Sequence, residues 1–294
     1  MSADRQLQAR LLTQAGKLLL EYNESSAAIN STLTATSKAL THEPCHVSVT
    51  CRGVSVSLGE HGSLQETVQE LRLNAAVQTG IHQILDQVRH HRLDAESASA
   101  RLSRVEADTP RHPRWLVAVL LGAAASSFAR LLGADEVAVV VTGLAAALGL
   151  LARQALARWH VSLLVLPFAA AFIGSLLGGA TIWLGWTRTP DLILMVPALV
   201  VVPGPHLING VFDLIDNYVP MGLSRLGLAA GILLASALGI VIGMELTIPL
   251  SSLPESTSGG DLNLFSDMVL AGIATCGFAA FYNTPWRQIG MAAV

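Results

Sequence analysis

The sequence predicts a mainly α-helical protein, a polytopic inner-membrane bundle that carries a small α+β domain at its N-terminus. The 294 residues are 52% hydrophobic and 13% charged, with a mean hydropathy of +0.52, and these values exclude an ordinary soluble domain. The charges are uneven, because residues 1–114 hold 12 Lys/Arg and 12 Asp/Glu whereas residues 115–294 hold 6 and 9. The second part also contains several apolar stretches of the length needed to cross a bilayer.

The net charge and the cysteine content restrict the partners and the compartment. A formal net charge of −3 and a pI near 6.3 argue against nucleic-acid binding, because the chain offers no basic field to a phosphate backbone. Cys45, Cys51 and Cys276 are too few for a disulfide framework and suit a reducing compartment. The start MSADRQLQARLL lacks the apolar core and cleavage site of a secretory signal, so the N-terminal domain is expected in the cytoplasm.

Residues 1–114 are predicted to form this α+β domain. Apolar residues recur at helical spacing over residues 7–40, on both sides of the break EYNESS at residues 21–26, which predicts two helices or one kinked helix. Between residues 46 and 58, apolar and polar residues alternate on both sides of an Arg-Gly turn, a pattern typical of a β-hairpin. Residues 64–105 predict one or two amphipathic helices.

The histidines and cysteines of this domain form no recognisable metal or catalytic motif. The candidates considered are His42, Cys45, His46, Cys51 and His61, followed by the pair His90 and His91. None has the paired C-x2-C spacing of a zinc site, so core and surface roles are favoured over metal binding. Glu21, Glu24, His42 and His46 are hydrolytic candidates. Because G-x-S-x-G and H-E-x-x-H motifs are missing, we expect no enzymatic activity, no metal and no cofactor.

Residues 115–249 are predicted to form a five-span bundle with a broken fourth helix, and residues 250–294 an external loop and a sixth span. The apolar stretches are Trp115–Leu132, Val137–Leu156, Val161–Trp186, Leu192–Ile215, Leu226–Leu246 and Leu264–Phe281. Each has about the 17–25 residues that a crossing requires. Glycines four residues apart predict close helix contacts, although glycine is also simply common in membrane helices. These pairs are Gly174 and Gly178, Gly227 and Gly231, and Gly239 and Gly243.

The arginines predict the orientation of the bundle. Cytoplasmic connections are enriched in Lys and Arg, so the segments that carry most of the arginines are placed inside and the acidic connections outside. The inside set is Arg111, Arg114, Arg153, Arg158, Arg225 and Arg287, and the outside acids include Asp135, Glu136, Glu255 and Asp261. Arg130 is the main exception. The predicted location is a bacterial inner membrane with a cytoplasmic N-terminus.

The fourth apolar stretch is interrupted near its middle. Pro203, Gly204 and Pro205 stand together there and cannot continue a regular helix. At about 1.5 Å per residue from Leu192, the break comes after roughly 16 Å, near the middle of a hydrocarbon core of about 30 Å. Irregular backbone at that depth is tolerated where it lines a cavity, so these three residues are candidates for a substrate site.

The residues after the break place polar side chains on one helix face. Pro205 suits the first turn of a new half-helix, whose free N–H groups favour a carboxylate. The polar residues at helical spacing are His206, Asn209, Asp213 and Asp216. A site-lining role is favoured over interhelical hydrogen bonding for His206 and Asn209, and the two are equally open for Asp213. Candidates for a gate or an ion pair are Asp216, which could instead cap a turn, Arg225 and Glu245.

With the N-terminal domain, the bundle and the stretch VPGPHLINGVFDLIDNYVPMGLSR together, the chain resembles the threonine/serine exporter family from about Leu7 to Leu246. The Pro-Gly with downstream Asn and Asp is the most specific part of the resemblance. In that family a cytoplasmic domain precedes a first membrane module, and a second module is fused behind it or supplied by a separate small subunit. The resemblance implies efflux of threonine and serine driven by proton motive force, while split two-subunit relatives are associated with export of dicarboxylates such as succinate.

Three functions are therefore compared. The leading hypothesis is a secondary exporter of threonine and serine, the alternative is a subunit of a dicarboxylate exporter, and the third is a membrane-anchored hydrolase or sensor. No G-x-x-x-x-G-K-[ST] motif is present, so an ion gradient and not P-loop ATP hydrolysis must supply the energy. Because the sixth span resembles the start of a second module, the expected partners are the lipid bilayer, a small substrate, protons and a second membrane subunit.

Overall fold

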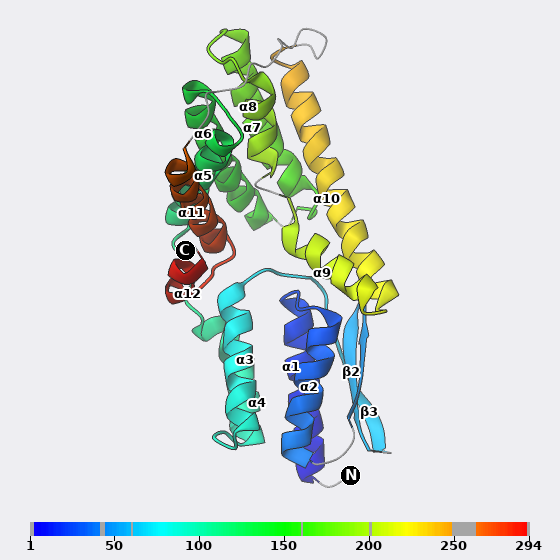
Figure 1. The fold of residues 1–294 in the computed structure, drawn as a ribbon. Coiled ribbons are helices and arrows are strands. Elements are labelled where there is room, and N and C mark those ends of the chain that lie inside the picture. The colour runs from blue at the N-terminus through cyan, green and yellow to red at the C-terminus, as the bar shows by residue number, and fades with distance from the viewer. Residues whose placement is uncertain are drawn as a thin grey trace. The chain divides into compact units, whose positions relative to one another are not determined.

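The computed structural model describes residues 3–41, 45–59, 61–159, 161–199, 202–248 and 263–292. The chain folds into two compact units, which Figure 1 shows. The first unit comprises Met1–Arg111 and Gly204–Leu228, and the second comprises His112–Pro203 and Ala229–Val294. His42, Glu255 and Asp261, which entered the predictions above, lie outside the described residues.

The predicted fold class is confirmed, because the chain is mainly helical with one small antiparallel sheet near its N-terminus. The elements of the first unit are α1 (Ala3–Glu21), α2 (Ser26–Thr41), β1 (Cys45–Thr50), β2 (Gly53–Leu58), β3 (His61–Thr67), α3 (Ala75–Arg89), α4 (Ala95–Asp108) and α9 (Gly204–Ile215), with the start of α10 (Val219–Glu245). The sheet has the order β1-β2-β3. Its first two strands form the predicted hairpin, in which Thr50 pairs with Gly53.

The third strand corrects the prediction that a helix begins at residue 64. Residues 61–67 pair with β2, Leu64 opposite Val56, and the helix starts only at Ala75. Apart from Leu64, the strand from Ser63 onward carries polar side chains that are mostly exposed, so it has no apolar alternation. The strand therefore gave no sequence signal, and it forms because β2 offers a free edge to pair with.

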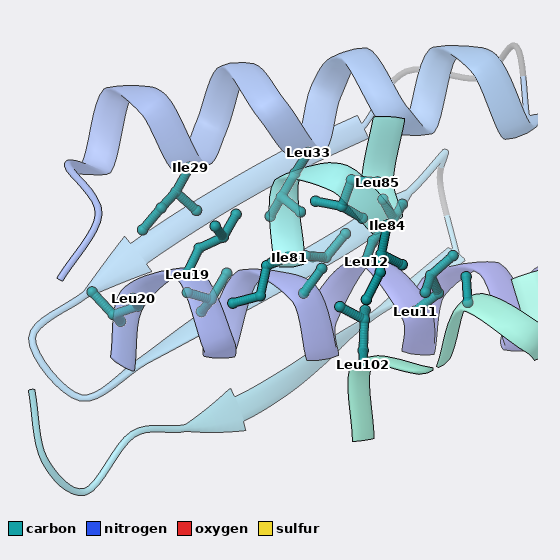
Figure 2. Close-up of a cluster of buried hydrophobic side chains, with 14 of the residues drawn as sticks. Leu11, Leu12, Leu19, Leu20, Ile29, Leu33, Ile81, Ile84, Leu85 and Leu102 are labelled. Carbon is teal, nitrogen blue, oxygen red and sulfur yellow. The ribbon is translucent and has the colours of Figure 1, made fainter. Parts of the chain in front are cut away.

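The core of the first unit forms around α1. This helix contacts α2 and β2 on one side and α3 and α4 on the other. Figure 2 shows leucines and isoleucines from all four helices meeting there. The fully buried members include Leu11, Leu12, Leu19, Leu20, Ile29, Leu33, Ile81, Leu85 and Leu102. Each such side chain contributes about 1.5–3 kcal/mol by leaving water, so α1 holds the unit together.

The second unit is a helical bundle. Its elements are α5 (Arg114–Leu131), α6 (Glu136–Leu156), the 3-10 turn η1 (Ala157–Trp159), α7 (Val165–Trp183), α8 (Pro190–Leu199), most of α10, α11 (Leu264–Phe281) and α12 (Trp286–Ala292). Among the described residues, α5, α6 with η1, α7, α10 and α11 are long and apolar enough to cross a membrane. At the predicted fourth span the structure has the two short helices α8 and α9, so that stretch is not a single spanning helix.

Two of the three glycine pairs lie at close contacts between helices. A Cβ on Gly239 would lie 2.5 Å from the carbonyl oxygen of Phe168, and one on Gly178 would lie 3.2 Å from the carbonyl oxygen of Ile193. By contrast, nothing lies within 4 Å of a Cβ on Gly227. The absence of a side chain thus lets α10 approach α7, and α7 approach α8, to backbone contact.

Candidate functional site

The helix that follows the Pro-Gly-Pro break has one polar buried face and one apolar exposed face. α9 begins at Gly204, directly after the buried Pro203, and Pro205 lies in its first turn. His206, Gly210 and Asp213 form the buried face. The apolar residues on the opposite face, Ile208, Val211, Phe212 and Ile215, are 47–68% exposed. A face of this kind in a membrane protein suits contact with lipid, and the polar face is held by protein.

The buried face of α9 lies against the turn between α1 and α2. Asn23 adopts a left-handed conformation there with φ of 62°, which asparagine tolerates better than most residues. The N–H groups of Asn23 and Glu24 donate to carbonyl oxygens in the last turn of α1, and α2 then begins at Ser26. Asn23 is 2% exposed and Ser26 fully buried, so this turn is part of the interior.

Asp213 binds both the start of α2 and a buried arginine. Its Oδ1 accepts a hydrogen bond of 2.7 Å from the backbone N–H of Ser26, and its Oδ2 lies 3.2 Å from Nη1 of Arg225. Both side chains of this ion pair are fully buried. A carboxylate at a helix N-terminus satisfies a free N–H and opposes the positive end of the helix dipole. Asp213 therefore caps α2 from a distant part of the sequence.

Two further side chains bind the backbone of the same turn. A second nitrogen of Arg225, Nη2, donates to the carbonyl oxygen of Glu24, and Nδ2 of Asn209 donates to that of Asn23. His206 lies within electrostatic range of Arg225. We call this group the polar cluster; it consists of Asn23, Glu24, Ser26, His206, Asn209, Asp213 and Arg225.

The carboxylate of Glu24 extends the polar cluster toward α3. It accepts hydrogen bonds from Nε2 of Gln78 at 2.6 Å and contacts Nε2 of His82 at 3.0 Å. Burial alone would raise the pKa of Glu24, but the hydrogen bonds with His82 and Gln78 outweigh it and hold the pKa below its usual value of 4.5. Glu24 is therefore bound in its charged form, between the side chains of Gln78 and His82.

Several buried atoms of the polar cluster make no hydrogen bond to any of the residues that the structure describes. Nη1 of Arg225 and Oδ2 of Asp213 attract each other as an ion pair but lack hydrogen-bond geometry. The other such atoms are Nε of Arg225, Nδ1 of His206, both side-chain amide atoms of Asn23, and Oγ of Ser26. Buried polar groups in proteins are nearly always satisfied, by protein or by a bound molecule. These donors and acceptors could therefore hold water or a small polar ligand, and the guanidinium favours a carboxylate.

The structure brings together some of the predicted site residues and separates others. His206, Asn209, Asp213 and Arg225 belong to the polar cluster, and Pro203, Gly204 and Pro205 mark the start of its helix. Asp216 follows the end of α9 and is exposed, so it does not share the buried face as predicted. Glu245, also exposed, is the last residue of α10 and belongs to the second unit.

Sequence reasoning missed the contribution of the turn at residues 23–26. From the sequence, Glu24 was predicted only as a candidate hydrolytic residue, and Asn23 and Ser26 were not predicted as site residues. The break EYNESS is a sufficient signal for a turn, but its partners lie 186–201 residues away along the chain. Within the described parts of the chain, no group of three or more His, Cys, Asp or Glu is arranged to hold a metal ion.

Comparison with known proteins identifies the family. The model of the family ThrE, described as "Putative threonine/serine exporter", matches residues 10–247. A protein of Escherichia coli K12 named "Probable succinate transporter subunit YjjP" is 28% identical over 243 residues, which cover 81% of this chain and 93% of that protein. A protein of Klebsiella aerogenes with the same name is 25% identical over 253 residues, or 84% and 97% of the two chains. No solved structure matches. The chain therefore belongs to the ThrE family of transporters and is a multi-pass membrane protein.

Proposed function

We propose that this chain is one subunit of a secondary exporter of small dicarboxylates, such as succinate, across the bacterial inner membrane. Proton motive force drives the transport. The proposal is supported by the names of the two relatives, which match nearly their whole length. Membership of a transporter family supports the transport part of the proposal and gives no support to the hydrolase or sensor hypothesis.

The observation that carries the proposal is the buried Arg225, whose Nε and Nη1 make no hydrogen bond among the described residues, although Nη1 is in an ion pair with Asp213. A guanidinium binds a carboxylate through two parallel N–H groups. In Arg225, Nη2 donates to the carbonyl oxygen of Glu24, and the N–H groups on Nε and Nη1 are left to bind a carboxylate. We therefore assign the substrate route to the break residues Pro203, Gly204 and Pro205 and to the polar cluster, with Arg225 as the cation that receives the carboxylate.

The ion pair offers a way to couple substrate to protons. While Asp213 is ionised, its carboxylate competes with the substrate carboxylate for Arg225. When Asp213 takes a proton, that competition ends and Arg225 becomes available to the substrate. His206 shares the buried face of α9 with Asp213 and is a second group able to carry a proton, and Asn209 holds α9 to the turn during the exchange.

Threonine and serine remain a second candidate because the family is described by them. A zwitterion matches the ion pair, with its carboxylate on Arg225 and its ammonium on Asp213. A dicarboxylate carries no positive group that could pair with Asp213, so it does not bind Asp213 directly. In Asp213→Asn, counterflow of threonine per folded molecule should therefore fall, whereas that of succinate should persist. Asp216→Asn, an exposed change three residues on, is the matched control.

The decisive experiment is counterflow of labelled succinate, threonine and serine in vesicles. Vesicles should contain the chain alone, the chain with a candidate second membrane subunit, or neither. We expect succinate exchange only with both subunits, inhibited by unlabelled succinate. Exchange of threonine or serine without succinate would favour the second candidate. No exchange in any combination would overturn the proposed transport activity.

A further inference from the structure

Arg153 lies in the second unit and lines an otherwise apolar cavity. It stands three residues before the end of α6, and the cavity beside it has a volume of about 10 Å³. The walls come from α5, α7, α8 and α11 as well as α6, and they include Leu121, Ala170, Pro197 and Phe281. All of these walls are apolar, so Arg153 is the one charged group among the residues that line the cavity.

No carboxylate among the described residues lies within ion-pair distance of Arg153. Its guanidinium carbon is 5.8 Å from the centroid of the Phe281 ring, a cation–π contact that satisfies none of its five N–H donors. Arg225 differs, because it is paired with Asp213, and so does Arg130, which donates to the carbonyl oxygen of Ala134. Arg153 is partly buried near the end of α6, and a cation there without an anionic partner among the described residues is costly; such residues in membrane helices mark substrate pathways.

We propose that Arg153 forms a second carboxylate-binding site, on the substrate route through the membrane helices. This inference rests on the proposed function for the identity of the ligand, a small carboxylate with an apolar backbone. The guanidinium binds the carboxylate of the ligand through two N–H groups, and the apolar walls of the cavity contact the methylene groups of the ligand. The sequence assigned Arg153 only to the orientation of the bundle, since nothing local shows that five helices meet around it.

The cavity beside Arg153 is too small to hold a dicarboxylate in this structure. A volume of about 10 Å³ holds no more than one water molecule, so the structure shows the proposed site in a closed state. Pro197 lies within α8, where it removes one backbone hydrogen bond and gives the helix a point at which to bend. Binding therefore requires the walls of the cavity to move apart, and the bend point in α8 offers one way to do so, which ties occupancy of this site to a conformational change.

Equilibrium binding to the purified full-length chain in detergent tests the site. The probes are succinate, acetate and threonine, and the readout is the ligand-dependent rise in melting temperature. The variants are Arg153→Gln and the control Arg158→Gln, an exposed arginine five residues on. We expect Arg153→Gln to weaken succinate binding at least about tenfold and Arg158→Gln to leave it unchanged. Acetate should bind more weakly than succinate, because it lacks the methylene chain.

The outcomes separate this site from the proposed function. Unchanged succinate affinity in Arg153→Gln would overturn the site and leave transport intact. Binding that requires Arg153, together with no succinate counterflow either from the chain alone or with the second subunit, would support the site and overturn the transport proposal. If wild type binds none of the probes, the site is overturned. If Arg153→Gln does not fold, Arg153→Lys replaces it: an ammonium cannot bind both carboxylate oxygens, so weaker binding is again expected, and unchanged affinity overturns the site.

Discussion

Asp213 caps a helix that begins 187 residues earlier in the chain. In an ordinary N-cap the accepting side-chain oxygen belongs to the residue just before the helix, as the amide oxygen of Asn74 does for α3 and the carboxylate of Asp94 for α4. At α2 the cap comes from α9, and Arg225 neutralises its charge. The start of α2 and the helix after the Pro-Gly-Pro break therefore depend on one another.

Replacing Asp213 by asparagine should destabilise the protein strongly. The change leaves Arg225 buried without its counter-charge, and breaking a buried pair in this way costs about 3–5 kcal/mol. We expect a lower free energy of unfolding for the purified protein in detergent, measured by denaturant titration. Asp216→Asn is the control and should change it by less than about 0.5 kcal/mol, because Asp216 is exposed. Equal effects of the two changes would contradict a structural role for the ion pair.

The carboxylate of Glu24 predicts a pH dependence of stability. Its pKa is held below the usual 4.5 in the folded protein, so the unfolded chain binds a proton at higher pH than the folded one. The contribution of Glu24 is therefore complete above about pH 4.5 and is lost as the pH falls through the lowered pKa. The difference in melting temperature between wild type and Glu24→Gln should be constant near neutral pH and shrink below pH 4.5. A constant difference down to pH 3 would contradict this assignment.

At the scale of single elements, the glycines of α10 make the clearest prediction. Gly239→Ala would place a Cβ 2.5 Å from the carbonyl oxygen of Phe168 in α7, a contact that only backbone movement can relieve. We expect the free energy of unfolding to fall by about 1–3 kcal/mol. Gly227→Ala on the same helix meets nothing and should be neutral or slightly stabilising, since alanine favours helix. Thermal unfolding of both variants in detergent checks the difference.

The Pro-Gly-Pro break replaces one predicted membrane-spanning helix after residue 190 with two short helices. A continuous helix over residues 192–215 would have been long enough to span a membrane. The Pro-Gly-Pro sequence divides it into α8 and α9, which belong to different compact units. α9 then binds the turn at residues 23–26 through its polar face and leaves its apolar face exposed.

At the scale of the whole molecule, the orientation predicted from the arginines can be tested through Cys51. Cys51 is exposed, whereas Cys45 and Cys276 are partly buried and can be replaced by serine. A membrane-impermeant thiol reagent should label the remaining Cys51 in inverted vesicles but not in right-side-out vesicles or intact spheroplasts. The converse pattern would place the N-terminal domain outside and reverse the predicted topology.

Much of the fold was accessible from the sequence because its signals are local. Apolar stretches of bilayer length predicted six spans, and at five of them the described residues form helices long and apolar enough to cross a membrane. Helical periodicity predicted α1 and α2, and alternation around an Arg-Gly turn predicted the hairpin. The conspicuous Pro-Gly-Pro break led to the right family. Strand β3 was missed because its polar residues carry no periodic pattern, and it forms only as the partner of β2.

The sequence by itself determined that this is a polytopic membrane protein with a small α+β domain, since hydropathy and periodicity act over a few residues, and its resemblance to a known family indicated transport. Only the tertiary structure decided which polar residues meet. The partners of Asp213, Asn209 and Arg225 lie near residue 24, and Arg153 faces a cavity built by five helices. Such contacts form when distant segments pack to satisfy buried charges and backbone groups, and no local pattern records them.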